Sequence, residues 1–209
     1  MRYFTADLHL GDKAIARWRG FDEERLAQHD AMILDAINAC VGEDDELWLL
    51  GDLCKARLED VAAMRDAICC QHINIIVGNH DSRSKFLTCG GFDSIEYYAE
   101  VGRVSRDGYK FIMCHYPMLD WDRAYHGSFM LHGHIHSLPV EPGEHIKPLS
   151  ASEGGMGMRG YNVWNAEQGI RRFDVGLDAN GYRPVSADEI RAALPSDEEW
   201  TALHNLPVD

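Results

Sequence analysis

The chain has 209 residues, 45% of them hydrophobic and 10% aromatic, a composition that excludes a disordered chain. This length is sufficient to bury a core, and we expect a single domain over residues 1–209. The formal net charge of −14 argues against duplex nucleic acid as a partner, because neutralising its phosphates requires clustered Lys and Arg.

The cysteines and the N-terminal residues indicate the cellular compartment in which we expect the protein. The six cysteines form no CxxC pair, and a chain of this size needs no disulfide bonds, so reduced thiols are expected. The start, MRYFTADLHLG, lacks the apolar region of a signal peptide, and no stretch approaches the roughly 20 apolar residues of a membrane span. We therefore expect a soluble cytoplasmic protein with no membrane partner.

The first part of the chain predicts alternating strands and helices, a pattern typical of an α/β fold. In chain order we expect a strand at 2–6, a short turn or helix at 13–17, an amphipathic helix from about 22 to 42, a strand at 47–50, a helix at 58–68 and a strand at 73–77.

Beyond residue 90 the pattern favours a second, more antiparallel sheet. Strands are expected at 95–98, 101–105 and 109–114, with Asp107-Gly108 closing a hairpin. Three prolines and five glycines make 137–160 too broken for regular structure, so it is either a surface loop or a lid whose Met156, Met158 and Arg159 meet a ligand. After a strand near 171–175, capping boxes at Ser186 and Ser196 predict two terminal helices.

Five apolar runs end in side chains that bind metals. In open α/β sheets such groups gather beyond the carboxyl ends of the strands, so we expect them to meet in space. His and carboxylate ligands suit Mn, Fe, Ni or Zn, and two such ions about 3.5 to 4 Å apart can hydrolyse a phosphate ester. The groups are Asp7 and His9, then Asp52, then Asn79 to Asp81, then His115, and finally His134 and His136.

Glycine precedes three of these groups, at Gly51, Gly78 and Gly133. A glycine lets the backbone turn sharply without a Cβ clash, so we expect tight turns that aim the following ligands. Asp52, alone after its strand on such a turn, is placed to bridge two ions.

The ordered motifs resemble those of the calcineurin-like metallophosphoesterase superfamily, whose pattern runs DxH, GD, GNHD or GNHE, H and GHxH. All five elements occur in order between residues 3 and 136, and other stretches are similar to small bacterial and phage phosphoesterases. The resemblance implies an α/β fold in which two mixed β-sheets form an αββα four-layer sandwich with flanking helices.

Carried over position by position, the resemblance also implies the roles of the ligands. One metal would be held by Asp7, His9, Asp52 and His136, and the other by Asp52, Asn79, His115 and His134. His80 would be the general acid for the leaving group, oriented by Asp81.

These features predict a hydrolase that uses two divalent metal ions to cleave phosphate esters of a small phosphorylated substrate. One alternative is a phosphodiesterase or nuclease acting on cyclic nucleotides or single strands. Another is a non-catalytic scaffold of the same fold, although the presence of His80 argues against it. An HD-type phosphohydrolase is disfavoured because His80-Asp81 follows a strand and glycine rather than lying on a helix.

Three further residues are candidate substrate contacts. Trp121 and His126 lie between two ligand motifs, where an aromatic ring can stack on a base or sugar, and Lys55 follows the Asp52 motif. Packing at the rim for the first two, and a solvated charge for Lys55, are the competing interpretations. Arg17, Trp18 and Arg19 could bind a phosphate tail, but exposure on the surface without a role in binding is the preferred interpretation.

Overall fold

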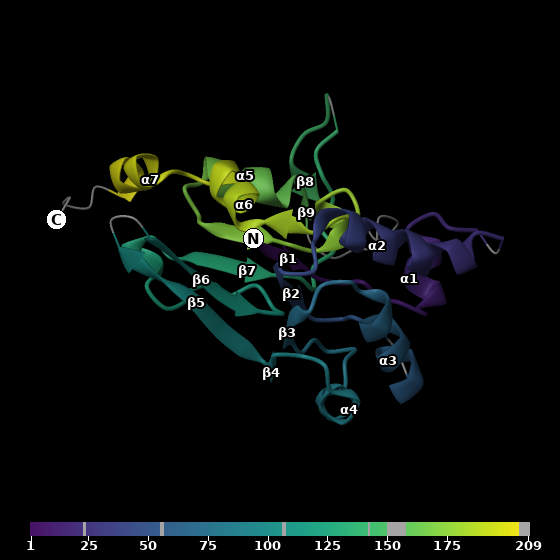
Figure 1. The fold of residues 1–209 in the computed structure, drawn as a ribbon. Coiled ribbons are helices and arrows are strands. Elements are labelled where there is room, and N and C mark those ends of the chain that lie inside the picture. The colour runs from purple at the N-terminus through teal and green to yellow at the C-terminus, as the bar shows by residue number, and fades with distance from the viewer. Residues whose placement is uncertain (23, 55–56, 106–107, 142, 150–157, 205–209) are drawn as a thin grey trace.

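The computed structural model describes residues 1–22, 24–54, 57–105, 108–141, 143–149 and 158–204. Two mixed β-sheets form its centre and helices surround them (Figure 1), which confirms the expected α/β sandwich at this level of detail. Within the predicted loop or lid at 137–160, residues 142 and 150–157, which include Met156, lie outside the described residues, as do Lys55 and Asp107.

The first sheet has the order β11-β1-β2-β3-β4, in which β1 to β4 are parallel and β11 is antiparallel. Its strands, in that order, are Val185–Ser186, Arg2–Thr5, Glu46–Leu50, His72–Ile76 and Ser94–Glu96.

The second sheet has the order β10-β7-β6-β5, in which the first three strands are parallel and β5 is antiparallel to β6. These strands are Arg172–Asp174, Phe129–His132, Gly108–Cys114 and Tyr98–Ser105. A separate pair joins β8 (Lys147–Pro148) to β9 (Met158–Arg159).

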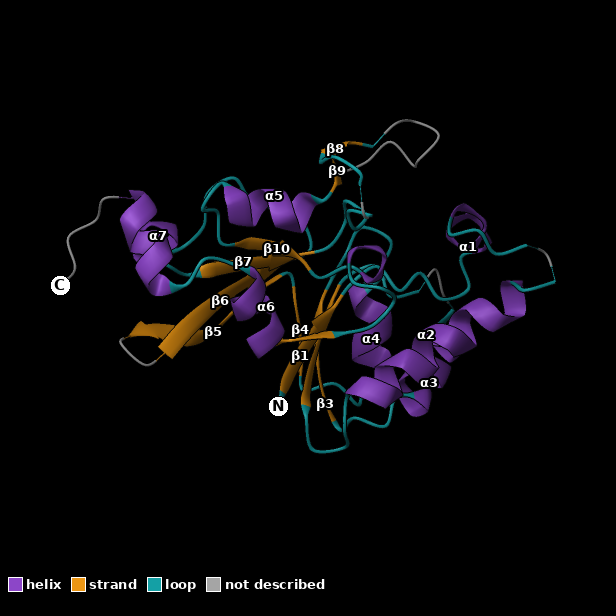
Figure 2. Ribbon diagram, turned by 90° about the horizontal axis from the view of Figure 1, so that it is seen from above, coloured by secondary structure: helices purple, strands orange, loops and turns teal. Residues whose placement is uncertain are grey.

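The described helices are α1 (Lys13–Trp18), α2 (Leu26–Cys40), α3 (Leu58–Ala67), α4 (Arg83–Cys89), α5 (Tyr161–Glu167), α6 (Ala187–Ala193) and α7 (Asp197–His204), with 3-10 turns η1 (Ala124–His126) and η3 (Leu177–Ala179). Seen from above, α1 to α4 lie on one side and α5 to α7 on the other (Figure 2). No helix in these ranges has the length and hydropathy to cross a bilayer.

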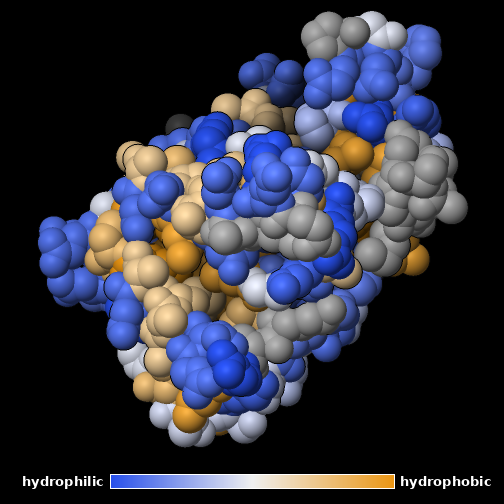
Figure 3. All heavy atoms as spheres, turned by 90° about the vertical axis from the view of Figure 1, so that its right-hand side faces the viewer, coloured by the Kyte–Doolittle hydropathy of each residue, from blue (hydrophilic) through white to orange (hydrophobic). Residues whose placement is uncertain are grey.

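Successive side chains of a strand point to opposite faces of the sheet, so the buried residues form two hydrophobic cores. Along β2, Leu47 and Leu49 face the helices α2, α3 and α4, whereas Trp48 and Leu50 face the second sheet. Between the sheets, Phe4 and Phe111 pack edge to face with ring centroids 5.1 Å apart. Both hydrophilic and apolar side chains reach the surface on the face that carries α1 to α3 (Figure 3).

Most predicted elements are confirmed, and the two helices that the sequence analysis missed lack a capping box. The N-cap of α4 is Ser82, which makes no side-chain cap hydrogen bond, and that of α5 is Gly160, which has none to make. Both have seven residues and no acidic side chain in the first turn. By contrast, both capping boxes form: Glu189 and Glu199 accept backbone N–H groups from Ser186 and Ser196, respectively.

Candidate metal centre

The predicted ligands come together at the carboxyl ends of five strands. Those that follow β1, β2 and β3 belong to one parallel sheet, and those that follow β6 and β7 belong to the other. Because the two sheets face each other, their strand ends deliver side chains to one location.

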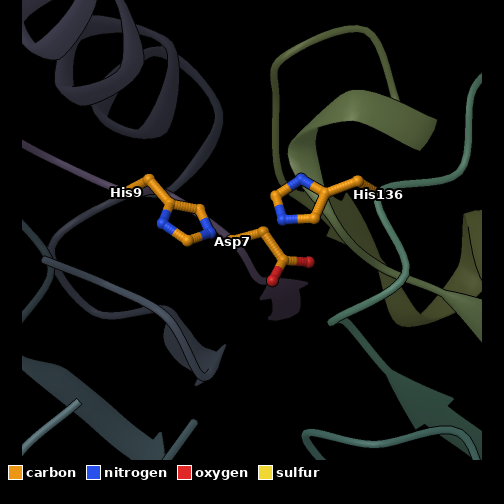
Figure 4. Close-up of side chains that lie close together, drawn as sticks. All are labelled: Asp7, His9 and His136. Carbon is orange, nitrogen blue, oxygen red and sulfur yellow. The ribbon is translucent and has the colours of Figure 1, made fainter. Parts of the chain in front are cut away.

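Asp7, His9 and His136 form the first ligand group, in which one donor atom from each side chain lies within 4.8 Å of the others. All three residues are buried. The two imidazole rings face each other with the side chain of Asp7 between them in the view of Figure 4, and their centroids are 5.0 Å apart.

Asp52, His115 and His134 form the second ligand group, in which one donor atom from each side chain also lies within 4.8 Å of the others. The Oδ1 atom of Asn79 lies 3.0 Å from Nε2 of His115, so the predicted amide ligand is in place as well. The structure therefore brings together all seven residues predicted as metal ligands.

Asp52 stands between the two groups. Its Oδ2 atom lies 3.8 Å from Nε2 of His9 and 3.4 Å from Nε2 of His115. Its Oδ1 atom accepts the backbone N–H of His80 at 2.8 Å, which fixes the orientation of the carboxylate. This position agrees with a bridging role.

The backbone of the ligand segments is strained. Asp7, His9, Asp52, His134 and His136 all have φ between 46° and 75°, the left-handed region that residues with a Cβ seldom occupy. Each such residue costs roughly 1–3 kcal/mol and persists only where its surroundings impose it. Five of the seven predicted ligands share this feature, so the fold holds them against local preference, as is typical of a functional site.

The glycines beside the ligands act in two ways. Gly51 has φ of +93°, which confirms the sharp turn before Asp52. Gly78 and Gly133 do not have positive φ, so the turn argument was wrong for them. A Cβ at Gly78 would lie 2.3 Å from Oδ1 of Asp52, and one at Gly133 would lie 2.6 Å from Oδ2 of Asp7. Their missing side chains leave space for the ligand carboxylates.

The donor atoms fit divalent cations. The buried Nε2 atom of His9 has no hydrogen-bond partner among the described residues, and it faces Asp52 at 3.8 Å. That separation is less than two metal–ligand bonds of about 2.0 to 2.2 Å each, so one ion can bind both atoms. Nδ1 of His115 donates to the carbonyl of Leu50 at 2.9 Å, which turns Nε2 toward the oxygens of Asp52 and Asn79. Nε2 and these two oxygens can all act as metal ligands once Nε2 is deprotonated.

Burial and mutual charge set the protonation of this site. Burial raises the pKa of Asp7 to about 7, against the lowering effect of His136 and His115. Burial also lowers the pKa of His9 to about 3, which leaves a neutral imidazole, the form that binds metals. Burial disfavours the charge of His115, but the hydrogen bond to Asp52 and the nearby carboxylates raise its pKa to about 9.

His80 lies at the mouth of the centre. Its side chain is 43% exposed, and its Nε2 atom is 4.0 Å from Oδ2 of Asp52. Its ring lies edge-on to that of His9, with centroids 5.2 Å apart. The ring is thus accessible to a ligand from outside while it remains beside the metal ligands.

Asp81 does not have the expected orienting contact with His80. Its Oδ2 atom accepts the backbone N–H groups of Gly78 and Asp52 at 2.9 and 2.8 Å, and its Oδ1 atom accepts that of Leu53 at 2.9 Å. The prediction is corrected because these three backbone donors occupy the half-buried carboxylate. Asp81 instead ties the turn after β3 to the turn after β2, which carries Asp52.

Two of the three candidate substrate contacts lie elsewhere. His126 precedes β7, and so does Ser128, the residue to which Trp121 is hydrogen-bonded. Both therefore lie at the opposite end of that strand from His134. The indole N–H of Trp121 donates to Ser128, at 3.0 Å from Oγ, and His126 lines a cavity with Tyr109 at the start of β6. The substrate-contact predictions for Trp121 and His126 are therefore wrong, since chain length alone does not show which way the loop returns. The Lys55 prediction lies outside the described residues.

Tyr116 is an aromatic residue that reaches the second ligand group. Its ring centroid lies 4.7 Å from that of His134 and 5.1 Å from that of His115, and the residue is 46% exposed. It therefore forms part of the rim of the second ligand group.

Arg19 and Asp178 are functional candidates that the sequence analysis missed. Both side chains are buried, with Arg19 0% and Asp178 1% exposed. The expectation that Arg19 is an exposed surface residue was therefore wrong. Asp178 accepts Nδ1–H of His136 at 2.7 Å. One available signal was the position of Asp178 shortly after β10, at the same sheet edge as the ligands.

Comparisons with known proteins give relatives without a stated activity. No family model matches the chain. It is 26% identical to the Gene 66 protein of Mycobacterium phage L5, over 97% of this chain and 98% of that protein. The Gene 66 protein of Mycobacterium phage D29 is also 26% identical, over 94% and 97% respectively. A crystal structure of a protein of unknown function from Aquifex aeolicus matches with a TM-score of 0.63 and 20% identity, over 93% of this chain and 99% of that one, which shows a shared fold.

Proposed function

We propose that the chain is a metal-dependent phosphoesterase of the calcineurin-like type, with the αββα four-layer sandwich of that superfamily. The position of Asp52 carries the proposal. Its Oδ2 atom faces His9 of one ligand group and His115 of the other, at 3.8 and 3.4 Å. A carboxylate shared between two ligand groups is what a two-metal hydrolytic centre requires.

When bound, two divalent ions of the Mn, Fe, Ni or Zn kind would lower the pKa of water and neutralise charge on the phosphoryl oxygens. The residues of the chain would hold the two ions in place and transfer one proton. His80 is accessible from outside and sits beside Asp52, so we assign it to protonate the leaving oxygen as the ester bond to phosphorus breaks. It then recovers a proton from solvent.

A small phosphorylated substrate suits the net charge of −14, which disfavours long polyanions. A phosphodiesterase acting on cyclic nucleotides or single strands is the second candidate. The exposed ring of Tyr116 beside His134 supports it, because such a ring can stack on a base.

Paired substrates test the proposal. Chelator-treated protein, reconstituted with Mn²⁺, would be assayed with 4-nitrophenyl phosphate and bis(4-nitrophenyl) phosphate side by side, followed by nucleotides, phosphosugars and cyclic diesters. Mn-dependent hydrolysis of any of them supports the proposal, and a strong preference for diesters supports the second candidate. Protein that binds Mn²⁺ but hydrolyses none of them would be a scaffold rather than an enzyme.

A further inference from the structure

A buried ion pair lies behind the first ligand group. Nε of Arg19 donates to Oδ1 of Asp178 at 2.8 Å, and Nη2 donates to Oδ2 at 2.9 Å. Both side chains are removed from solvent, so the planar guanidinium fixes the carboxylate in a two-point contact.

The same carboxylate fixes one ligand. Oδ2 of Asp178 accepts Nδ1–H of His136 at 2.7 Å, which leaves Nε2 of that ring as the atom available to an ion. The ring of Trp18 packs edge-on against His136 with centroids 5.5 Å apart and limits its rotation further. His136 is thus held on two sides.

Arg19 also holds the segment that carries the other two ligands of this group. Its Nη2 atom donates to the backbone carbonyl of Asp7 at 2.6 Å, and Nη1 donates to that of Leu8 at 3.1 Å. Nη1 further contacts Nε2 of His29 at 3.0 Å, and Nδ1 of His29 contacts Asp30 at 2.8 Å. One guanidinium therefore connects Asp178 to the backbone between the two strained ligands Asp7 and His9.

The second ligand group is supported differently. Nδ1 of His115 donates to a backbone carbonyl, that of Leu50, rather than to a carboxylate. A carboxylate on the far nitrogen orients an imidazole and makes it a more basic ligand, whereas a carbonyl orients it with less charge. The two groups therefore differ in chemistry even though each supplies a carboxylate and two histidines.

We propose that Asp178, fixed by Arg19, is a positioning residue that selectively strengthens metal binding at the Asp7, His9 and His136 group. This inference rests on the proposed function, since it presumes that both groups bind ions. Loss of such an outer partner typically weakens metal affinity about 10- to 100-fold.

The test measures metal binding, not activity. Chelator-treated wild-type protein and Asp178→Asn would be titrated with Mn²⁺, with free Mn²⁺ followed by electron paramagnetic resonance and heat by calorimetry. We expect two sites in wild type, and in the variant one site weakened about 10- to 100-fold with the other unchanged. An unchanged pair of sites, or two sites weakened equally, would overturn the inference.

Asn is isosteric with Asp and retains an oxygen for Arg19, so the variant is expected to fold. Arg19→Lys is the second variant, and it decides the question if Asp178→Asn does not fold, because Lys loses the two-point contact with Asp178. Its matched control is Arg171→Lys, another buried arginine, which donates to the carbonyls of Pro195 and Gly127 at the far end of the second sheet. Arg171→Lys should leave both sites intact, and an equal selective loss there would count against the inference.

Failure of this inference differs from failure of the proposed function. Wild-type protein that binds no Mn²⁺ would contradict the proposed function itself. Wild-type protein that binds two ions, with Asp178→Asn and Arg19→Lys binding them equally well, would contradict only the positioning role of Asp178.

Discussion

Oδ2 of Asp52 lies 3.4 Å from Nε2 of His115, although the two residues come from different sheets. The same oxygen is 3.8 Å from His9 of the other ligand group. Removal of the negative charge of Asp52, which is shared by both ligand groups, should therefore affect more metal than removal of the charge of Asp7, which belongs to one group. We predict that Asp52→Asn loses both metals, whereas Asp7→Asn loses one.

Metal content after gel filtration, measured by plasma mass spectrometry, checks this prediction. Asn preserves the shape of both side chains, and circular dichroism provides the control for folding. If Asp52→Asn retained as much metal as Asp7→Asn, Asp52 would not be a bridging ligand.

His80→Ala should retain its metals and lose turnover. The side chain of His80 is 43% exposed and belongs to neither ligand group, so metal content should match that of wild type. Loss of a general acid typically lowers the rate about 100- to 10,000-fold. Steady-state kinetics with Mn²⁺ measures it, and a substrate whose leaving group needs no proton should be affected much less. Equal rates in wild type and variant would remove the assignment.

Gly78→Ala should displace Asp52, although the φ angle of residue 78 itself suits alanine. The new Cβ would lie 2.3 Å from Oδ1 and 2.5 Å from the backbone nitrogen of Asp52, and Gly78 has no positive φ. We expect a loss of about 1–3 kcal/mol of unfolding free energy from overpacking, together with reduced metal content. Urea denaturation and metal analysis measure these effects. Gly42→Ala is the control, because its nearest neighbour is the flexible end of Asp45 at 3.3 Å.

Periodicity and turn chemistry predicted the strands that position the centre, and the ligands followed from their place at strand ends. Asp7, Asp52 and His115 could be found because each directly follows a predicted strand. Their convergence needed only the rule that parallel strands share one edge.

Contacts between distant segments could not be predicted in the same way. Arg19 and Asp178 are 159 residues apart, and neither belongs to a recognisable motif. The backbone partners of Asp81 depend on the geometry of two turns, which residue identity does not specify. His126 was misplaced because a loop between parallel strands returns to the opposite end of the sheet, and this becomes clear only once β6 and β7 are known to be parallel.

Metal binding should release protons, and its affinity should rise with pH. In chelator-treated protein, the hydrogen bond and charge of Asp52 keep the pKa of His115 at about 9 against the effect of burial, so this ring is protonated at pH 7. Burial raises the pKa of Asp7 to about 7, so it is partly protonated there. The ion at the first ligand group must displace the proton of Asp7 and the ion at the second group that of His115, since ligands bind metals in their deprotonated forms.

Calorimetric titration with Mn²⁺ at pH 7, in buffers of different ionisation enthalpy, counts the released protons. The number should fall as the starting pH rises through 9, because His115 is then already deprotonated. Asp7→Asn should release fewer protons at pH 7 than wild type does, whereas His80→Ala should release the same number. Proton release that did not depend on pH between 6 and 9 would show that neither Asp7 nor His115 binds a metal ion.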